Sequence, residues 1–186
     1  MSTNRVKDEL RRRILSTRDA LSPDEYQQLS RIISQKLMSD PLIKGAQNIL
    51  SYQPFRSEVD IATFHEWAHT EGKTIAFPVI LPDRSMVAAV PNDSQAMLPR
   101  AFGIRSPDLH KSRIIEQDDL DCILIPCVAF SAEGYRLGMG GGFYDRYLNG
   151  CGKAVKLGVA FSLQKAEEPF QEAWDIPLDG IITEEA

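Results

Sequence analysis

The chain has 186 residues, of which 43% are hydrophobic, and it carries a formal net charge of -5 at pH 7. This length suffices for one well-buried core and is short for two, so we expect a single domain spanning residues 1–186. The acidic total argues against a nucleic-acid-binding protein, which normally carries a positive field, but it leaves anionic small molecules open as ligands.

The sequence shows no pattern that is typical of a targeting signal. No apolar run is long enough to span a membrane, and the charged start MSTNRVKDELRRRIL lacks the apolar core of a signal peptide. We therefore expect a cytoplasmic protein without membrane contact. The cysteines are odd in number and not spaced like a zinc pair, so we expect buried thiols in a reducing compartment. These are Cys122, Cys127 and Cys151.

Two helices are predicted first. Apolar residues at helical spacing indicate an amphipathic helix: Val6, Leu10 and Ile14. SPDE at residues 22–25 has the pattern of a capping box with proline in the first turn, so a second helix should begin there and end before Asp40-Pro41. Basic residues are concentrated near the N-terminus and can form a local anion site: Lys7, Arg11, Arg12, Arg13 and Arg18.

A strand, a helix and a second strand follow, at residues 48–53, 57–72 and 73–80. This order predicts parallel pairing of the two strands through a right-handed crossover. SMVAAV, at 85–90, is interpreted as an antiparallel edge strand, and residues 91–111 as an extended loop because they lack periodicity.

The most apolar run, LDCILIPCVAF, predicts a central strand, and further strands are predicted at 154–161 and 179–183. The alternation of strands and helices predicts an α/β fold of three layers. We expect a mostly parallel, Rossmann-like sheet with helices on both faces and a ligand crevice at the carboxyl ends of its strands.

The segment GYRLGMGGGFYDRYL, residues 134–148, contains glycine at a density that a simple turn does not need. Backbone amides freed of side chains can form an anion-binding nest, and a helix opened by GFYDRYL adds positive potential. Arg136 and Arg146 can bind phosphate bidentately, and Asp145 suits a divalent cation that bridges to the phosphates. The loop matches neither a P-loop nor a dinucleotide fingerprint, and a tight strand-to-helix turn is the alternative interpretation.

The glycine segment, following ILIPCVAF, resembles the signature of the 5-formyltetrahydrofolate cyclo-ligase family. The resemblance extends to the N-terminal pattern of Lys7, Leu10 and Arg11, to SYQPFRSEVD with Glu58, and to the C-terminal WDIPLDGIIT. It implies an enzyme that uses ATP and Mg²⁺ to close the ring of 5-formyltetrahydrofolate, giving 5,10-methenyltetrahydrofolate, ADP and phosphate. The formyl oxygen would attack the γ-phosphate, and the phosphorylated intermediate would then cyclise. We expect a monomer, with a homodimer as the alternative.

The resemblance also implies which residues form the ATP site. Arg136, Asp145 and Arg146 would be catalytic, and Asp145 and Asp179 would be metal ligands, with Asp175 as a competitor for the second place. The residues that would contact ATP are Lys7, Arg11, Arg136, Leu137, Gly138, Met139, Gly140, Gly141, Gly142, Phe143 and Tyr144. Lys7 and Arg11 lie one helical turn apart on a common face; solvated surface charges are the alternative for them.

The folate site is implied by the same resemblance. Glu58 would hydrogen-bond the pterin, and Tyr52 and Phe55 would pack against it, although both aromatic residues can equally belong to the core. The loop residues that would also face the folate are Met139, Gly140, Gly141, Gly142 and Phe143. Some family members carry a basic residue where this chain has Gly141, so Arg136 or Arg146 would have to compensate.

Two other functions compete with this interpretation. HEWAH, residues 65–69, matches the zinc-protease pattern, with His65 and His69 as ligands and Glu66 as base. That assignment leaves the glycine loop unexplained, and the histidines can simply flank a packing face. A folate- or nucleotide-binding protein without turnover is the second alternative.

Overall fold

A mixed sheet forms the centre of the protein in the computed structural model, which describes residues 3–99, 104–172 and 175–185. In the described residues this sheet has seven strands in the order β11-β10-β7-β1-β2-β3-β6. Its first five strands in this order are parallel, whereas β3 and β6 are antiparallel to their neighbours. The strands are β1 (Asn48–Leu50), β2 (Thr74–Ile80), β3 (Met86–Pro91), β6 (Ser112–Ile115), β7 (Cys122–Pro126), β10 (Val155–Val159) and β11 (Gly180–Ile182).

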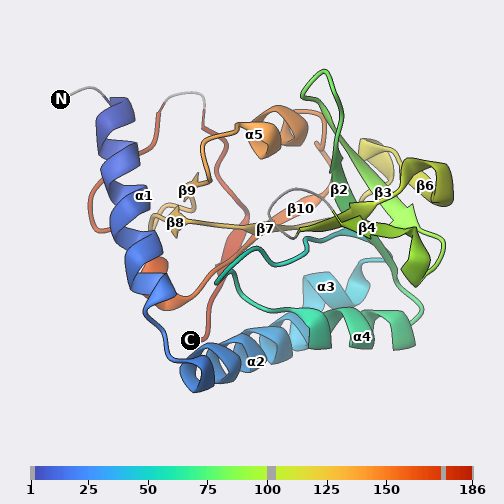
Figure 1. The fold of residues 1–186 in the computed structure, drawn as a ribbon, viewed down its shortest axis with the longest axis horizontal. Coiled ribbons are helices and arrows are strands. Elements are labelled where there is room, and N and C mark those ends of the chain that lie inside the picture. The colour runs from blue at the N-terminus through green and yellow to red at the C-terminus, as the bar shows by residue number, and fades with distance from the viewer. Residues whose placement is uncertain (1–2, 100–103, 173–174, 186) are drawn as a thin grey trace.

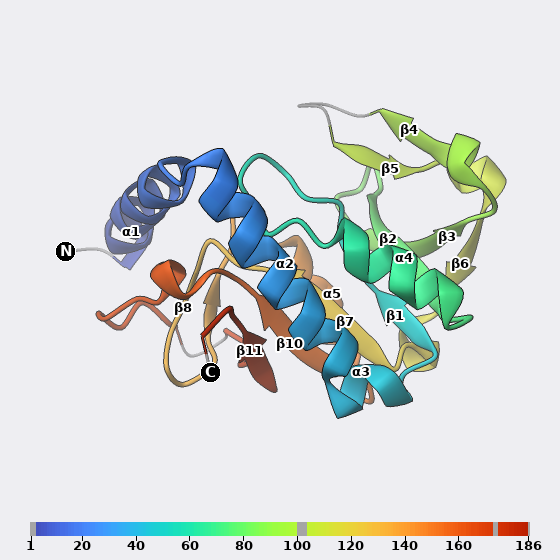
Figure 2. The same ribbon diagram turned by 90° about the horizontal axis from the view of Figure 1, so that it is seen from below.

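Helices lie on both sides of this sheet (Figure 1). The helices are α1 (Thr3–Asp19), α2 (Pro23–Ser39), α3 (Pro41–Gly45), α4 (Ala62–Thr70) and α5 (Phe143–Leu148). Figures 1 and 2 show α2, α3 and α4 together below the sheet, α5 above it, and α1 beside it. The predicted three-layer α/β architecture is therefore confirmed, although the upper layer is thin.

The central strand β7 explains why the core has two halves. Successive side chains of a strand point to opposite faces. Leu124 therefore belongs to the hydrophobic cluster between the sheet and the helices α2 and α4, while Ile123 and Ile125 belong to the cluster between the sheet and α5. All three are fully buried. A third cluster lies where α1 packs on the short hairpin of β8 (Ala129–Phe130) and β9 (Arg136–Leu137).

The local sequence signals at the second helix are confirmed. Ser22 accepts a hydrogen bond from the Glu25 backbone, and the Glu25 side chain accepts one from the Ser22 backbone, so the capping box is complete. The helix ends at Ser39, as expected, but Asp40 then caps the short helix α3, which was not predicted. The β1-α4-β2 unit is parallel, with α4 beginning at Ala62 rather than at residue 57.

The prediction for residues 91–111 is wrong. This stretch contains β4 (Met97–Pro99) and β5 (Arg105–Pro107), which pair antiparallel, and residues 100–103 between them lie outside the described residues. Strands of three residues are too short to show an alternating pattern. The prediction that β3 is the edge strand is also wrong, because β6 pairs with it on the outer side.

The cysteines are buried free thiols, as predicted. Burial raises the pKa of Cys122 and of Cys127 to about 12, so neither is a thiolate at neutral pH. In the described part of the chain, no helix has both the length and the apolar character needed to cross a membrane.

The two-sided burial of β7 leads to a stability prediction. Leu124→Ala should lower the free energy of unfolding by about 2–5 kcal/mol, because it leaves a cavity in the cluster under α2 and α4. Leu42→Ala, at a leucine that is 53% exposed, is the matched control and should change it by less than about 0.5 kcal/mol. Chemical denaturation of both variants measures the difference, and equal effects would contradict this account of the core.

Candidate active site

The glycine loop, residues 138–142, connects β9 to α5. The loop was expected directly after the central strand; in the structure the β8-β9 hairpin lies between them. Gly140 and Gly142 have φ of 92° and 64°, a region that residues with a side chain rarely adopt. A Cβ added to Gly141 would lie 2.6 Å from the Phe143 ring. The positive φ therefore favours glycine at 140 and 142, whereas Gly141 leaves room for the Phe143 ring in the position that it occupies here.

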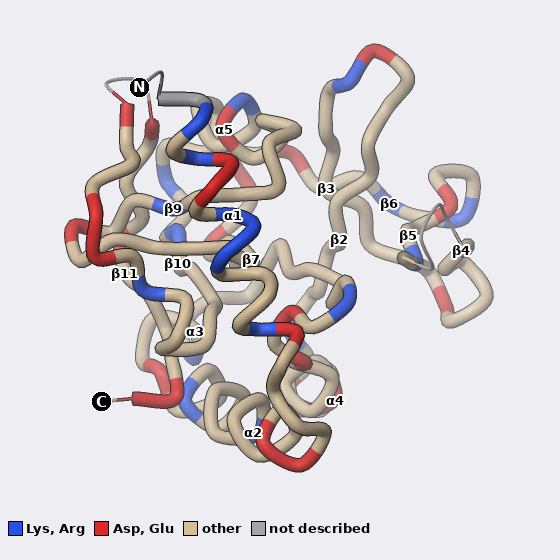
Figure 3. Tube along the Cα trace, turned by 60° about the vertical axis from the view of Figure 1, so that its left-hand side comes forward, with Lys and Arg blue, Asp and Glu red and all other residues tan. Residues whose placement is uncertain are grey.

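Helix α1 brings Arg11 to this loop. The Nε of Arg11 donates a hydrogen bond of 2.8 Å to the carbonyl oxygen of Gly138. A Cβ on Gly140 would lie 3.6 Å from the guanidinium carbon, an ordinary van der Waals distance, so the φ of 92° rather than space favours glycine there. Arg11 also pairs with Asp8 at 2.6 Å on its own helix. Figure 3 shows Lys and Arg positions repeating along α1.

Lys7, one turn earlier on α1, is only 8% exposed. Its Nζ forms ion pairs with Glu172 at 2.7 Å and with Asp175 at 3.0 Å. Burial by itself would lower the pKa of Lys7, but the hydrogen bonds and charges of these two carboxylates outweigh it and raise the pKa above its ordinary value. Lys7 therefore stays charged, and the alternative of a solvated surface lysine is wrong.

Arg136 and Asp145 form an ion pair of 2.6 Å between β9 and α5. The Arg136 side chain is 4% exposed, whereas the Asp145 side chain is 47% exposed, so the carboxylate remains open to a ligand from solvent. The guanidinium carbon of Arg136 also lies 6.0 Å from the centroid of the Tyr144 ring.

Arg146 lies on the other side of α5. Its Nη2 donates to the carbonyl oxygens of Arg84 at 3.2 Å and Gly141 at 3.3 Å. Its guanidinium carbon lies 5.3 Å from the Phe143 ring centroid. Arg146 therefore joins the glycine loop to the turn between β2 and β3. In the loop itself, the Met139 side chain is 52% exposed and Leu137 is buried.

Glu58 lies in a turn that follows β1. Its carboxylate accepts a hydrogen bond of 2.9 Å from the backbone N–H of Phe55, and its backbone carbonyl accepts one of 2.7 Å from the Tyr26 hydroxyl. Burial raises the pKa of the Glu58 carboxyl, while the Phe55 N–H and the charge of Arg18 act in the opposite direction. Tyr52 is 2% exposed and donates to the carbonyl of Val59, so its ring lies in the core.

Tyr144 links the Glu58 turn to the glycine loop. Burial raises the pKa of its hydroxyl; the charge of Glu58 acts in the same direction and that of Arg136 opposes it. The hydroxyl oxygen is buried and has no hydrogen-bond partner among the described residues. Arg136 thus contacts the Tyr144 ring, and the charge of Glu58 acts on the Tyr144 hydroxyl.

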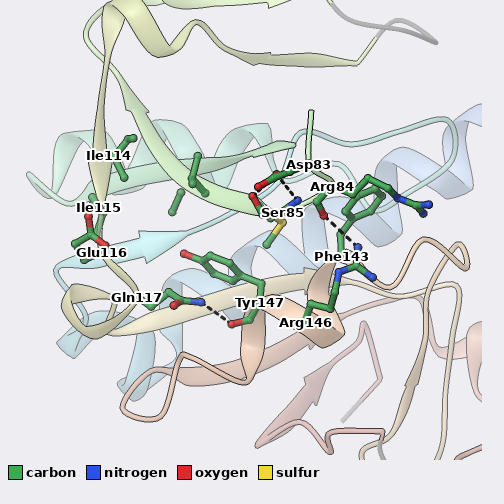
Figure 4. A pocket seen from close by; sticks show the side chains of 13 residues that line it. Asp83, Arg84, Ser85, Ile114, Ile115, Glu116, Gln117, Phe143, Arg146 and Tyr147 are labelled. Atoms are coloured by element: carbon green, nitrogen blue, oxygen red, sulfur yellow. Dashed lines mark hydrogen bonds between the residues drawn. The ribbon is translucent and has the colours of Figure 1, made fainter. Parts of the chain in front are cut away.

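A cavity of about 400 Å³ lies beside the loop, between α5 and the strands β3 and β6. Figure 4 shows Arg84, Phe143 and Arg146 on one side of it and Ile114 to Gln117 on the other. Its buried apolar lining includes Met86, Ala88, Ile115 and Tyr147. The sequence did not predict this cavity, because its walls come from three separate segments. Glu172, the partner of Lys7, was also missed, since its segment has no pattern.

The two candidate aspartates for the second metal position differ in their surroundings. Asp179 accepts a hydrogen bond of 2.7 Å from the Lys156 backbone and so ties the start of β11 to β10. Asp175 contacts Lys7 instead. No hydrogen bond or ion pair joins Asp179 to Asp145 in the described residues, and no group of three or more His, Cys, Asp and Glu side chains there could hold a metal ion.

Mg²⁺ nevertheless suits the donors at the loop. It typically binds through one or two carboxylates together with substrate phosphates and water. Asp145 offers a half-exposed carboxylate at the loop. The residues present therefore fit an ion that arrives with a nucleotide.

The HEWAH segment lies on α4, as predicted. The Nε2 of His65 lies 2.7 Å from Ser51 Oγ, and its ring packs edge-on against Phe77. Burial lowers the pKa of His65 to about 4, which is typical of a neutral, packed imidazole. His69 is exposed. Each histidine is thus explained by packing or solvent exposure, and neither supports zinc-dependent hydrolysis.

Comparison with known proteins identifies the family of the chain. The 5-formyltetrahydrofolate cyclo-ligase family model matches residues 3–184. The 5-formyltetrahydrofolate cyclo-ligase of Escherichia coli K12 is 30% identical, over 91% of this chain and 96% of that protein. The corresponding protein of Mycoplasma pneumoniae is 32% identical, over 96% and 99%.

Two solved structures are similar over nearly the whole chain. The 5,10-methenyltetrahydrofolate synthetase of M. pneumoniae gives a TM-score of 0.80 at 31% identity, covering 96% of this chain and 99% of that one. That of Aquifex aeolicus gives 0.86 at 34% identity, covering 97% and 91%. The motifs, the fold and these matches lead to one conclusion: the chain belongs to the 5-formyltetrahydrofolate cyclo-ligase family.

Proposed function

We propose that the chain converts 5-formyltetrahydrofolate to 5,10-methenyltetrahydrofolate, using ATP and Mg²⁺ and releasing ADP and phosphate. Family membership supports the reaction class. The single observation that carries the proposal is the contact of Arg11 with Gly138, because it puts a cation from the distant helix α1 beside a loop of unshielded backbone. Such an arrangement is suited to nucleotide phosphates.

The loop is suited to phosphoryl transfer because this chemistry depends mainly on positioning and charge neutralisation. The formyl oxygen attacks the γ-phosphorus of ATP, the bond from that phosphorus to the bridging oxygen breaks, and ADP leaves. The neighbouring folate nitrogen then bonds to the formyl carbon and loses its proton, and phosphate leaves with the former formyl oxygen. Arg136 and Arg146 stabilise the transferred phosphate, and Lys7 and Arg11 bind the nucleotide phosphates.

Mg²⁺ would be held by Asp145 together with the phosphates, and it would neutralise part of their charge. For a second carboxylate the contacts favour Asp175 over Asp179. Both carboxylates accept a backbone hydrogen bond, Asp175 from Glu172 and Asp179 from Lys156, but Asp175 also pairs with Lys7, one helical turn from the arginine that contacts the loop.

The folate would lie between the Glu58 turn and the glycine loop, since both approach Tyr144. Glu58 would accept hydrogen bonds from the donors of the pterin. The aromatic ring of Phe143, which lines the 400 Å³ cavity, offers an apolar surface to the remaining part of the substrate.

The overall proposal is tested by mixing purified protein with Mg-ATP and 5-formyltetrahydrofolate and following the absorbance of the methenyl product together with ADP. We expect one-to-one appearance of both, and neither without ATP or without the metal. Protein that binds both ligands but forms neither product would contradict the proposal and support a binding protein without turnover.

Asp145→Asn should lower kcat by about 100-fold or more, because the carboxylate that would hold Mg²⁺ against the phosphates is lost. The amide oxygen can still accept the Arg136 hydrogen bond, so folate affinity should change little. Steady-state kinetics at saturating ATP measures both quantities. Asp118→Asn, at an exposed carboxylate after β6, is the control and should behave like wild type. An Asp145→Asn enzyme with full turnover would rule out the metal role.

Asp175→Asn and Asp179→Asn distinguish the two candidates for the second carboxylate. We expect Asp175→Asn to raise the Mg²⁺ concentration needed for half-maximal turnover, and Asp179→Asn to leave it within about twofold. A magnesium titration at fixed ATP measures this requirement. The opposite result would return the assignment to Asp179.

Glu58→Gln should raise the folate KM by about 10- to 100-fold and leave the ATP KM unchanged, because an ionised acceptor becomes a neutral amide. Burial raises the pKa of Glu58, so wild-type folate affinity should fall as the pH is lowered through that raised pKa. The Gln variant should lose this pH dependence. Folate KM measured between pH 5 and 8 tests both points, and an unchanged folate KM would exclude Glu58 from the site.

A further inference from the structure

Arg18, at the end of α1, is a buried cation that the proposed chemistry does not use. Its relative exposure is 2%, which is rare for arginine. The Nε donates a hydrogen bond of 3.0 Å to Ser57 Oγ, but the Nη1 is buried without a partner among the described residues. Burying a guanidinium incompletely bonded is costly, so a compensating interaction is expected.

The turn that carries Glu58 is held by the corner between α1 and α2. Ser57 Oγ bonds to Arg18 and also donates to Asp19. The Tyr26 hydroxyl, from α2, donates to the Glu58 carbonyl. Within the turn Arg56 has a φ of 53°, a left-handed conformation that is unusual for a residue with a side chain. The backbone of the turn is thus fixed through contacts on both sides of Glu58.

The electrostatic surroundings of Glu58 make Arg18 important. The titratable groups whose charges couple to Glu58 are Arg18 from α1, Tyr26 from α2, Tyr52 after β1, Cys127 after β7 and Tyr144 from α5. Among these, Arg18 is the only cation. The others are neutral at physiological pH, since burial raises the pKa of each tyrosine and of Cys127.

We infer that Arg18 is a positioning residue for Glu58: it anchors the turn through Ser57, the neighbour of Glu58 in the chain, and places a buried positive charge beside this turn for folate binding. This inference rests on the proposed role of Glu58 in that binding. A cavity of about 310 Å³ also borders Arg18, Tyr26 and Arg56. The hydrogen bond of Arg18 runs to Ser57, the residue before Glu58, so the observations favour a role toward the Glu58 turn over an anion site in this cavity.

Arg18→Gln and Arg18→Lys separate the charge from the hydrogen bond, because both side chains are polar and only one is charged. With Gln, the folate KM at neutral pH should rise about threefold to tenfold, and the acid limb of kcat/KM for folate should move to higher pH. The acid limb should move in this direction because the removal of a nearby cation raises the pKa of a carboxyl group. With Lys, the acid limb should stay near its wild-type position.

The control is Arg13→Gln on the same helix. Arg13 forms an exposed ion pair with Glu168, and its replacement should leave the acid limb and folate KM unchanged. The ATP KM should stay within about twofold of wild type in all three variants, since the Glu58 turn does not bind ATP in this proposal. Identical pH profiles for Arg18→Gln, Arg18→Lys and wild type would overturn the electrostatic role.

Ser57→Ala keeps the buried charge and removes the hydroxyl to which Arg18 donates, so it tests the anchoring even if Arg18→Gln does not fold. We expect a higher folate KM with an unmoved acid limb, and an unchanged folate KM would overturn the anchoring. Comparing the single variants Arg18→Gln and Glu58→Gln shows whether the proposed role of Glu58 or the inferred role of Arg18 fails. If Glu58→Gln alone leaves folate affinity unchanged, the proposed role of Glu58 is wrong; if only Arg18→Gln lacks an effect, this inference is wrong.

Discussion

The contact between α1 and the glycine loop is the constraint on which the candidate site depends. The guanidinium of Arg11 reaches the carbonyl oxygen of Gly138, 127 positions away in the sequence. The helix is held there by apolar packing of Leu10 and Ile14 on the β8-β9 hairpin. Hydrophobic burial on one face of α1 therefore fixes where its cations lie.

Charge compensation is the second theme of the site. Each of three cations near the loop has a carboxylate partner: Arg11 pairs with Asp8, Lys7 with Glu172 and Asp175, and Arg136 with Asp145. Nucleotide phosphates would compete for these cations, and Mg²⁺ would compete for the carboxylates that they release. In these pairs three cations meet four carboxylates, so the cations become available to a ligand only when it displaces the carboxylates.

Glu58 differs from these pairs, because it is half-buried and forms no ion pair with any of the described residues. A hydrogen-bond acceptor that is already partly dehydrated loses less hydration when a ligand covers it, and it discriminates strongly against ligands without donors. Its cost is a tendency to become protonated, which the charge of Arg18 counteracts. The corner between α1 and α2 thus holds the Glu58 turn in place and, in the proposed site, also supports the recognition of folate.

Local patterns in the sequence determined the features that depend on neighbouring residues: the Ser22 capping box, the parallel β1-α4-β2 unit, the two-sided burial of β7, the buried cysteines and the glycines before α5. Only the tertiary structure decided the pairing of β6 with β3, the partners of Lys7 and Arg18, and the different surroundings of Asp175 and Asp179. The physical reason is the separation in sequence between the residues that interact. A cap or an alternating strand is set by residues a few positions apart, whereas the ion pair of Lys7 with Glu172 joins residues 165 positions apart and exists only once packing has folded the chain back on itself.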